Sequence, residues 1–157
     1  MKRIIALITC SLLALACLSS FAEETALTCE SIAEAALASA EFRELTDMTE
    51  RYMEKHLSIS MDISAADFEE WVMKRDATRA TPEMILVLKV RETADQAAIR
   101  QCIQEFNDEQ LLLYRDYQPA QVFKLENARV LENGPFIALI VSPDPPASIS
   151  ALGEGWH

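Results

Sequence analysis

Two runs of apolar residues predict the centre of a β-sheet. The first, Met84–Val90, is interrupted only by Lys89, and the second, Phe136–Val141, contains no polar residue. A strand that lacks polar alternation is covered on both faces or nearly so, which places it inside a sheet rather than at an edge. We therefore expect both runs to form central strands.

A helical pattern follows the first run and extends from Thr93 to Tyr117. Thr93 and Gln96 have the spacing of a capping box, in which each side chain bonds to the backbone of the other. The apolar positions that follow recur in steps of four and three, which is the stripe of an amphipathic helix. With Gln110 filling one gap, the stripe comprises Ile99, Ile103, Phe106, Leu113 and Tyr117.

Weaker patterns predict the elements that precede the first apolar run and its helix. Apolar and alanine-rich spacing indicates a helix over Thr28–Leu45, and a second short helix begins near Thr49. Polar and apolar residues then alternate from His56 to Ser64, which is typical of a half-exposed extended segment. Phe68–Lys74 reads as an edge strand because Glu69 and Glu70 lie among its apolar residues, where charge discourages aggregation.

The fold class predicted from these elements is α+β. After the long helix a short helical or turning segment leads to Ala128–Leu131, and Asn133-Gly134 then indicates a hairpin into the second apolar run. The expected architecture is two N-terminal helices followed by β-β-α-β-β. The four strands form an antiparallel sheet in the order first, second, fourth, third, with the helices, including the long one, packed on one face.

The N-terminal residues have the pattern of an export signal. Lys2 and Arg3 precede the uncharged apolar run Ile4–Leu18, which is short for a membrane span. Cleavage between Ala22 and Glu23 would follow a small residue. The predicted domains are therefore a signal peptide at 1–22, one α+β domain at 23–144 and a weakly ordered tail at 145–157, with at most a short helical turn near its middle.

Two other ways of processing the N-terminal residues stay open. Leu13–Cys17 ends in a cysteine preceded by small residues, so lipidation at Cys17 would tether the domain to a membrane. An uncleaved anchor is the third possibility. In each case the expected location is extracytoplasmic: secreted, or membrane-tethered if Cys17 is lipidated.

Charge narrows the classes of partner. The whole chain has a formal net charge of −11, and residues 1–22 contain two basic and no acidic residues, so the rest carries 12 basic against 25 acidic residues, a net of −13. Nucleic acid binding rests on clustered positive charge. The excess of acidic residues in this chain therefore excludes nucleic acid as a partner. An anionic surface would also repel the domain, so we expect membrane contact only through a lipid anchor.

No residue pattern identifies a catalytic, cofactor or metal site. His56, Ser60 and Asp62 resemble a triad, but same-face neighbours on a strand are about 6.5–7 Å apart, beyond hydrogen-bond reach, and no GxSxG elbow is present. The expected function is a non-enzymatic binding or accessory domain for an unknown cell-envelope protein or small ligand. The alternative is a small acidic metal-binding protein or hydrolase that uses His56 with Asp62 or Glu54.

Cys29 and Cys102 are the two cysteines that follow residue 22. Two interpretations stay open, because small apolar cysteines are common in protein cores and an exported pair can also be oxidised to a disulfide.

The long helix predicts an interaction surface. At 1.5 Å per residue it is about 37 Å long, whereas a seven-residue strand covers about 23 Å, so its end overhangs the sheet. That end contains Leu111, Leu112 and Tyr114, which would form an apolar patch in water. We expect the first helix to cover the patch through Ile32, Ala36 or Phe42, and a partner protein is the alternative.

Several short stretches of the chain carry a family resemblance: Ser31–Phe42, Phe68–Val72, Glu83, Tyr117-x-Pro119, Leu125–Ala128, the hairpin glycine and Val141–Asp144. Together they resemble a bacterial family of small exported proteins, often lipoproteins, the domain of unknown function numbered four-three-five-eight. The resemblance covers roughly residues 28–144 and implies no catalytic or binding residue. Relatives in this family typically continue into another helix where this chain has three prolines, Pro143, Pro145 and Pro146.

Overall fold

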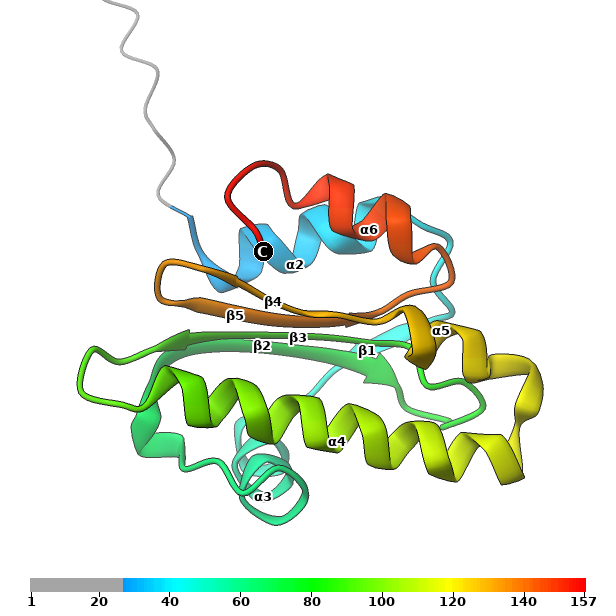
Figure 1. Ribbon diagram of the computed structural model, residues 1–157, viewed down its shortest axis with the longest axis horizontal. Helices are drawn as coiled ribbons and strands as arrows, with labels where there is room; N and C mark the ends of the chain where they lie inside the picture. Colours follow the sequence, from blue (N-terminus) through cyan, green and yellow to red (C-terminus); the bar gives the residue numbers. More distant parts are fainter. Residues whose placement is uncertain (1–26) are drawn as a thin grey trace, which may run out of the picture.

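A five-stranded antiparallel sheet runs through the middle of the structure, a computed structural model that describes residues 27–157 (Figure 1). The predicted signal peptide, its cleavage site at Ala22 and Glu23, and Cys17 lie outside the described residues. The strand order is β1-β2-β3-β5-β4. The strands are β1 (Leu45–Asp47), β2 (Phe68–Asp76), β3 (Met84–Val90), β4 (Val130–Asn133) and β5 (Phe136–Val141).

The predicted order of four strands is confirmed, and the sheet contains one strand more than predicted. The additional strand, β1, pairs with residues 74–76 of β2, so β2 is not the edge strand there. β1 lies where the sequence predicted the end of the first helix. That helix ends at Ala38, where Ser39 donates hydrogen bonds from its amide and its hydroxyl to the Ala36 carbonyl, and the chain then turns toward the sheet.

Helices cover both faces of the sheet, so the prediction of helices on one face is wrong. On one face lie α3 (Glu50–Ser60) and α4 (Gln96–Tyr117), and on the other lie α2 (Cys29–Ala38) and α6 (Pro145–Ala151), as Figure 1 shows. The short α5 (Val122–Asn127) follows α4 and packs against its end.

The apolar runs of the central strands supply two separate cores. Leu86 and Leu88 of β3 are fully buried under α3 and α4, while Ile85 and Val87 are fully buried under α2. Successive strand residues point to opposite faces, so a strand between two helical layers needs apolar residues at every position. The two layers explain why Met84–Val90 has no polar alternation.

The long helix begins later than predicted. Asp95, rather than Thr93, caps it by accepting a hydrogen bond from the Ala98 amide at 3.0 Å. Gln96 does not complete a capping box, since its side-chain amide donates to Glu132 and to the Gly134 carbonyl in the β4–β5 hairpin. The helix is thereby fixed to the hairpin that the Asn133-Gly134 pair predicted.

The buried face of α4 differs from the predicted stripe in its second half. Ile99, Ile103 and Phe106 are buried, but the row then continues to Tyr114, which is 5% exposed. Leu113 and Tyr117 are 58% and 69% exposed. The end of the helix extends beyond the sheet, so packing against the β2–β3 loop, rather than against strands, decides which side is buried there.

The segment from His56 to Ser60 is helical, which corrects its prediction as an extended strand. It forms the last turn of α3, whose buried residues Met53 and Leu57 are four apart and face the core. The alternation of polar and apolar residues is therefore incidental, and the four-residue spacing that begins at Met53 determines the structure. Ile59 points outward and is 71% exposed.

The C-terminal residues 145–157 form α6 and a return segment along the sheet edge. Two prolines stand at the start of α6, where the missing amide hydrogens cost nothing, and Asp144 caps it. Buried Ser148 bonds to the hydroxyls of Ser39 and Ser142. The helix is longer than the single turn expected, and three prolines do not prevent it.

Within residues 27–157, Cys29 and Cys102 form no disulfide, and they belong to cores on opposite faces of the sheet. The structure therefore favours the interpretation as packed thiols over a disulfide. Among the described residues, no helix combines the length and the apolar character that crossing a lipid bilayer requires.

Candidate functional site

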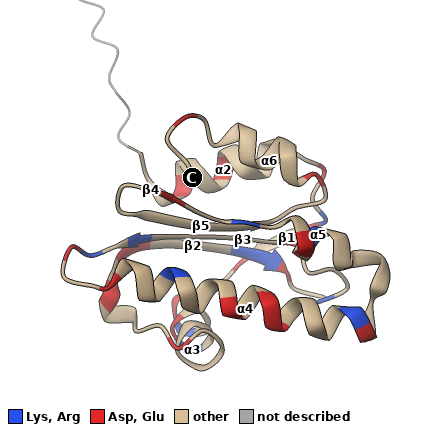
Figure 2. Cartoon of the chain, in the orientation of Figure 1, with Lys and Arg blue, Asp and Glu red and all other residues tan. Residues whose placement is uncertain are grey.

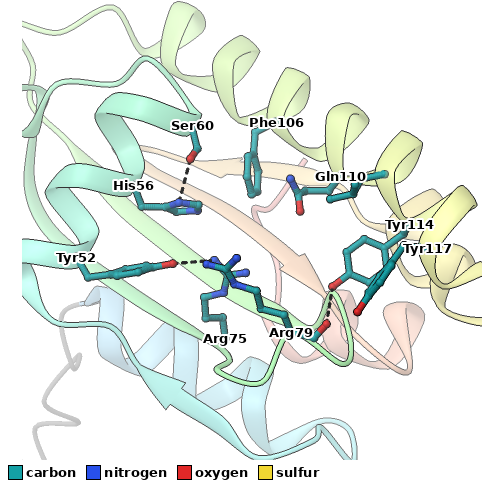
Figure 3. A pocket seen from close by; sticks show the side chains of 10 residues that line it. Tyr52, His56, Ser60, Arg75, Arg79, Phe106, Gln110, Tyr114 and Tyr117 are labelled. Carbon is teal, nitrogen blue, oxygen red and sulfur yellow. Dashed lines mark hydrogen bonds between the residues drawn. The ribbon is translucent and has the colours of Figure 1, made fainter.

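A cleft of about 500 Å³ opens between α3 and α4 beside the β2–β3 loop (Figure 3). Helix α3 provides one row of lining residues, Tyr52, His56 and Ser60, which are four apart and therefore lie on one side of the helix. The opposite wall belongs to the second half of α4. Its lining residues are Phe106, Gln110, Leu113, Tyr114 and Tyr117.

The base of the cleft carries two guanidinium groups. Arg75 extends from β2 and donates a hydrogen bond from Nη1 to the Tyr52 hydroxyl at 3.3 Å, and Arg79 extends from the β2–β3 loop. Among residues 27–157, no Asp or Glu lines the cleft. Within residues 27–157, neither arginine has a carboxylate within ion-pair distance. The cleft is thus a cationic site in an acidic protein, whose Asp and Glu residues Figure 2 shows in red.

A buried carboxylate shapes the loop that carries Arg79. Asp76 is 1% exposed, and its two oxygens accept hydrogen bonds from the backbone amides and hydroxyls of Thr78 and Thr81. Burial raises the pKa of Asp76, but these hydrogen bonds outweigh it and hold the pKa below its ordinary value. The loop also places Arg79 at φ 56°, a conformation that L residues seldom adopt.

His56 is a neutral, aromatic member of the wall. Burial, followed by the positive charges of Arg75 and Arg79, lowers its pKa from 6.5 to about 4. Its ring stacks on Tyr52 at 5.7 Å between centroids and meets Phe106 edge-on at 5.5 Å. Its Nδ1 bonds to the Ser60 hydroxyl at 3.1 Å, whereas its buried Nε2 has no partner in the described part of the chain.

The carboxylates named with His56 in the sequence analysis do not join it. Neither Asp62 nor Glu54 lines the cleft. Within the described part of the chain, no group of three or more His, Cys, Asp or Glu residues could hold a metal ion. A histidine with a pKa of about 4 is a weak general base at neutral pH, so this arrangement suits hydrogen bonding better than proton abstraction.

The predicted interaction patch divides into different environments. Tyr114 is buried and lines the cleft, Leu111 packs partly against the core, and Leu112 is 62% exposed. The prediction that the first helix covers this patch is wrong, because α2 packs on the opposite face of the sheet against β2, β3 and α6. Its alanines approach the strands closely and bury Ile85 and Val87 there.

One wall of the cleft has a signal in the sequence that the prediction of an extended segment did not use. Tyr52, His56 and Ser60 have helical spacing, which an extended interpretation of His56–Ser64 concealed. Arg75 and Arg79 stand in a charged loop, and no sequence pattern indicates that their side chains turn toward the same helices.

A comparison with models of protein families found a match for this chain. The model described as Domain of unknown function (DUF4358) matches residues 40–142, about two thirds of the sequence. The chain belongs to this family. A search of curated proteins and a search of solved structures each found no match.

The DUF4358 match contains every residue of the cleft, from Tyr52 to Tyr117. Helices α2 and α6, which cover the other face of the sheet, lie outside it. The cleft is therefore part of the DUF4358 domain itself. The family description assigns no activity, so the chemistry of the cleft is the basis for a function.

Proposed function

We propose that this protein is a non-enzymatic, extracytoplasmic binding domain whose cleft between α3 and α4 binds a ligand through an anionic group. One observation carries the proposal: Arg75 and Arg79 both face a cleft that has no carboxylate in its lining. An arginine in a folded protein is usually paired or solvated. Two at the base of one cleft form a site for a carboxylate or phosphate, which guanidinium groups bind in a fork.

The neighbouring groups are consistent with anion binding. The Tyr52 hydroxyl holds Arg75 in place, and the network around Asp76 holds the loop of Arg79. A site whose donors are fixed before binding loses less conformational entropy when the ligand arrives. Neutral His56 offers a ring for contact and adds no negative charge.

The extracytoplasmic part of the proposal rests on the N-terminal pattern of Lys2, Arg3 and the apolar run that follows them. Mass analysis of the native protein should find a chain that begins at Glu23 or at an acylated Cys17. An intact Met1 on a protein recovered from the cytoplasm would refute this part.

The binding part is tested by titrating the protein with acetate, sulfate and 3-phenylpropionate while recording amide chemical shifts by NMR. We expect shifts centred on the cleft and their loss in the Arg75→Ala/Arg79→Ala double variant. Arg51→Ala is the matched control, because Arg51 is an exposed arginine of α3 outside the cleft lining. Equal responses in the parent and the double variant would contradict anion recognition.

A further inference from the structure

The lining of the cleft is unusually rich in aromatic rings. The whole chain contains three tyrosines, and all of them, Tyr52, Tyr114 and Tyr117, line this one cleft. Phe106 is a fourth ring of the Phe, Trp or Tyr type among the ten lining residues, and the imidazole of His56 lies beside them. Aromatic residues make up only 7% of the chain as a whole. Rings gathered around a cavity offer faces and edges against which a flat ligand can pack.

One of these rings and a neighbouring leucine do not serve the core. Tyr117 is 69% exposed, and neighbouring Leu113 is 58% exposed, although both belong to the cleft wall. Large apolar side chains left in water at the rim of a concave site are typical of ligand-binding grooves. The hydroxyl of Tyr117 is bonded to no residue in the described part of the chain, and Figure 3 shows its ring beside Tyr114, facing the cleft.

The surroundings favour a single negative charge on the ligand. A second hollow adjoins the cleft and shares Ser60, Phe106 and Gln110 with it, but its other polar lining includes Asp62, Glu105 and Glu109. An anion that extends past Phe106 therefore meets carboxylates. The negative charge of the whole chain adds long-range repulsion that grows with ligand charge.

We propose that the ligand of this cleft is a monoanionic aromatic acid, a flat ring joined to one carboxylate. This inference rests on the proposed function and names its ligand class. The carboxylate binds Arg75 and Arg79, and the ring packs among Tyr52, His56 and Tyr117. A cleft of about 500 Å³ lies within the range of sites that hold small organic molecules.

Four probes of similar size test the proposal by NMR titration. They are 3-phenylpropionate, its uncharged amide, the saturated ring analogue 3-cyclohexylpropionate, and phenyl phosphate. We expect 3-phenylpropionate to bind about ten- to a hundredfold more tightly than the amide, the range of a charge-assisted hydrogen bond. The aromatic ring should add about two- to tenfold over the saturated ring. Phenyl phosphate, which carries more negative charge at neutral pH, should bind more weakly than 3-phenylpropionate.

Two variants separate the contributions of the ring and of the charge. Tyr117→Leu keeps an apolar side chain at an exposed position and should reduce the preference for 3-phenylpropionate over 3-cyclohexylpropionate. Leu112→Ala, an exposed change outside the cleft lining, is its control. Glu105→Gln/Glu109→Gln should improve phenyl phosphate binding more than 3-phenylpropionate binding, and more so at low salt.

The outcomes distinguish this inference from the proposed function. If the acid and its amide bind equally, or no probe perturbs the cleft at millimolar concentration, anion recognition fails and the inference fails with it. If both acids bind far better than the amide but equally to each other, the aromatic class is overturned and the proposed function stands. If phenyl phosphate binds more tightly than 3-phenylpropionate, the single-charge requirement is overturned and anion recognition again stands.

Discussion

The β2–β3 loop shows how a single buried residue fixes a cation that faces outward. Asp76 accepts four hydrogen bonds from Thr78 and Thr81, and Arg79 lies between these two threonines at φ 56°. A conformation of this kind costs about 1–3 kcal/mol and persists only where surrounding contacts impose it. Here the buried carboxylate imposes it, and the result is a guanidinium held at the base of the cleft.

His56 should titrate far below an ordinary histidine. Its folded-state pKa of about 4 lies below 6.5, so between these values the folded protein binds fewer protons than the unfolded chain. Its contribution to the free energy of unfolding therefore falls as the pH drops from 6.5 through 4. An NMR titration of the imidazole should give a midpoint near pH 4. Between pH 6.5 and pH 4, the free energy of unfolding should fall less in the His56→Gln variant than in the parent. A midpoint near 6.5 would mean that the ring is solvated.

The cleft could be predicted from sequence only in part, because its residues come together through tertiary contacts. Tyr52, His56 and Ser60 repeat every four residues, so one helix face could be predicted. Their apposition to Arg79 depends on a loop whose conformation is set by Asp76, a long-range buried contact. The local patterns of a single sequence contain no information about such a contact, whereas the hydrophobic period of a helix is local and can be read directly.

Between elements, a buried ion pair connects α5 to the start of β3. Lys124 and Glu83 are 8% and 4% exposed in their side chains, and Nζ lies 2.5 Å from Oε1. The other Glu83 oxygen accepts the Arg43 backbone amide at 2.6 Å. One carboxylate thus joins three segments that are far apart in sequence, namely the approach to β1, the start of β3 and α5.

Breaking this pair from one side should be costly. Lys124→Met leaves the Glu83 charge buried without its partner, and we expect a loss of about 3–5 kcal/mol in the free energy of unfolding. The double variant Lys124→Met/Glu83→Gln removes the charge but keeps an acceptor for the Arg43 amide, so it should recover much of the loss. Denaturant unfolding of both variants measures this. A double variant no more stable than the single one would contradict the electrostatic explanation.

The central strand supplies a second test at this scale. Leu86 is fully buried in β3, and Leu86→Ala should cost about 2–5 kcal/mol, since it removes core contacts and leaves a cavity. Leu112→Ala is the matched control, because Leu112 is 62% exposed and its loss should change stability by no more than about 0.5 kcal/mol. Similar denaturation midpoints for the two variants would show that β3 is not central.

Secondary elements could be predicted from the sequence where the pattern of apolar residues is unambiguous. Met84–Val90 and Phe136–Val141 read as central strands and are central. The layer architecture was missed although the same runs implied it, because a strand apolar at every position requires cover on both faces. The short β1 carries only three residues, and Leu45–Asp47 has no strand pattern of its own. It becomes a strand by pairing with β2.

At the scale of the whole molecule, the sheet separates the two cysteines of the described chain. Burial, with a smaller contribution from the Glu70 carboxylate, raises the pKa of Cys29 to about 12, so its thiol is unreactive. Cys102 lies on α4 and is partly exposed. In the chain that begins at Glu23, iodoacetamide should label Cys102 before unfolding and Cys29 only afterwards. A mass that shows an internal disulfide after mild oxidation would contradict the separation of the two cores.

The return of the chain to β4 has a consequence for behaviour in concentrated solution. The backbone of His157 exchanges two hydrogen bonds with Glu132, at 3.0 and 3.2 Å, while Trp156 packs against the core beneath α2. An open sheet edge offers a template on which another molecule can add a strand. Here the backbone of His157 occupies part of that template. A purification tag joined after His157 therefore emerges beside a protected edge, and removal of residues 153–157 should expose it and promote self-association.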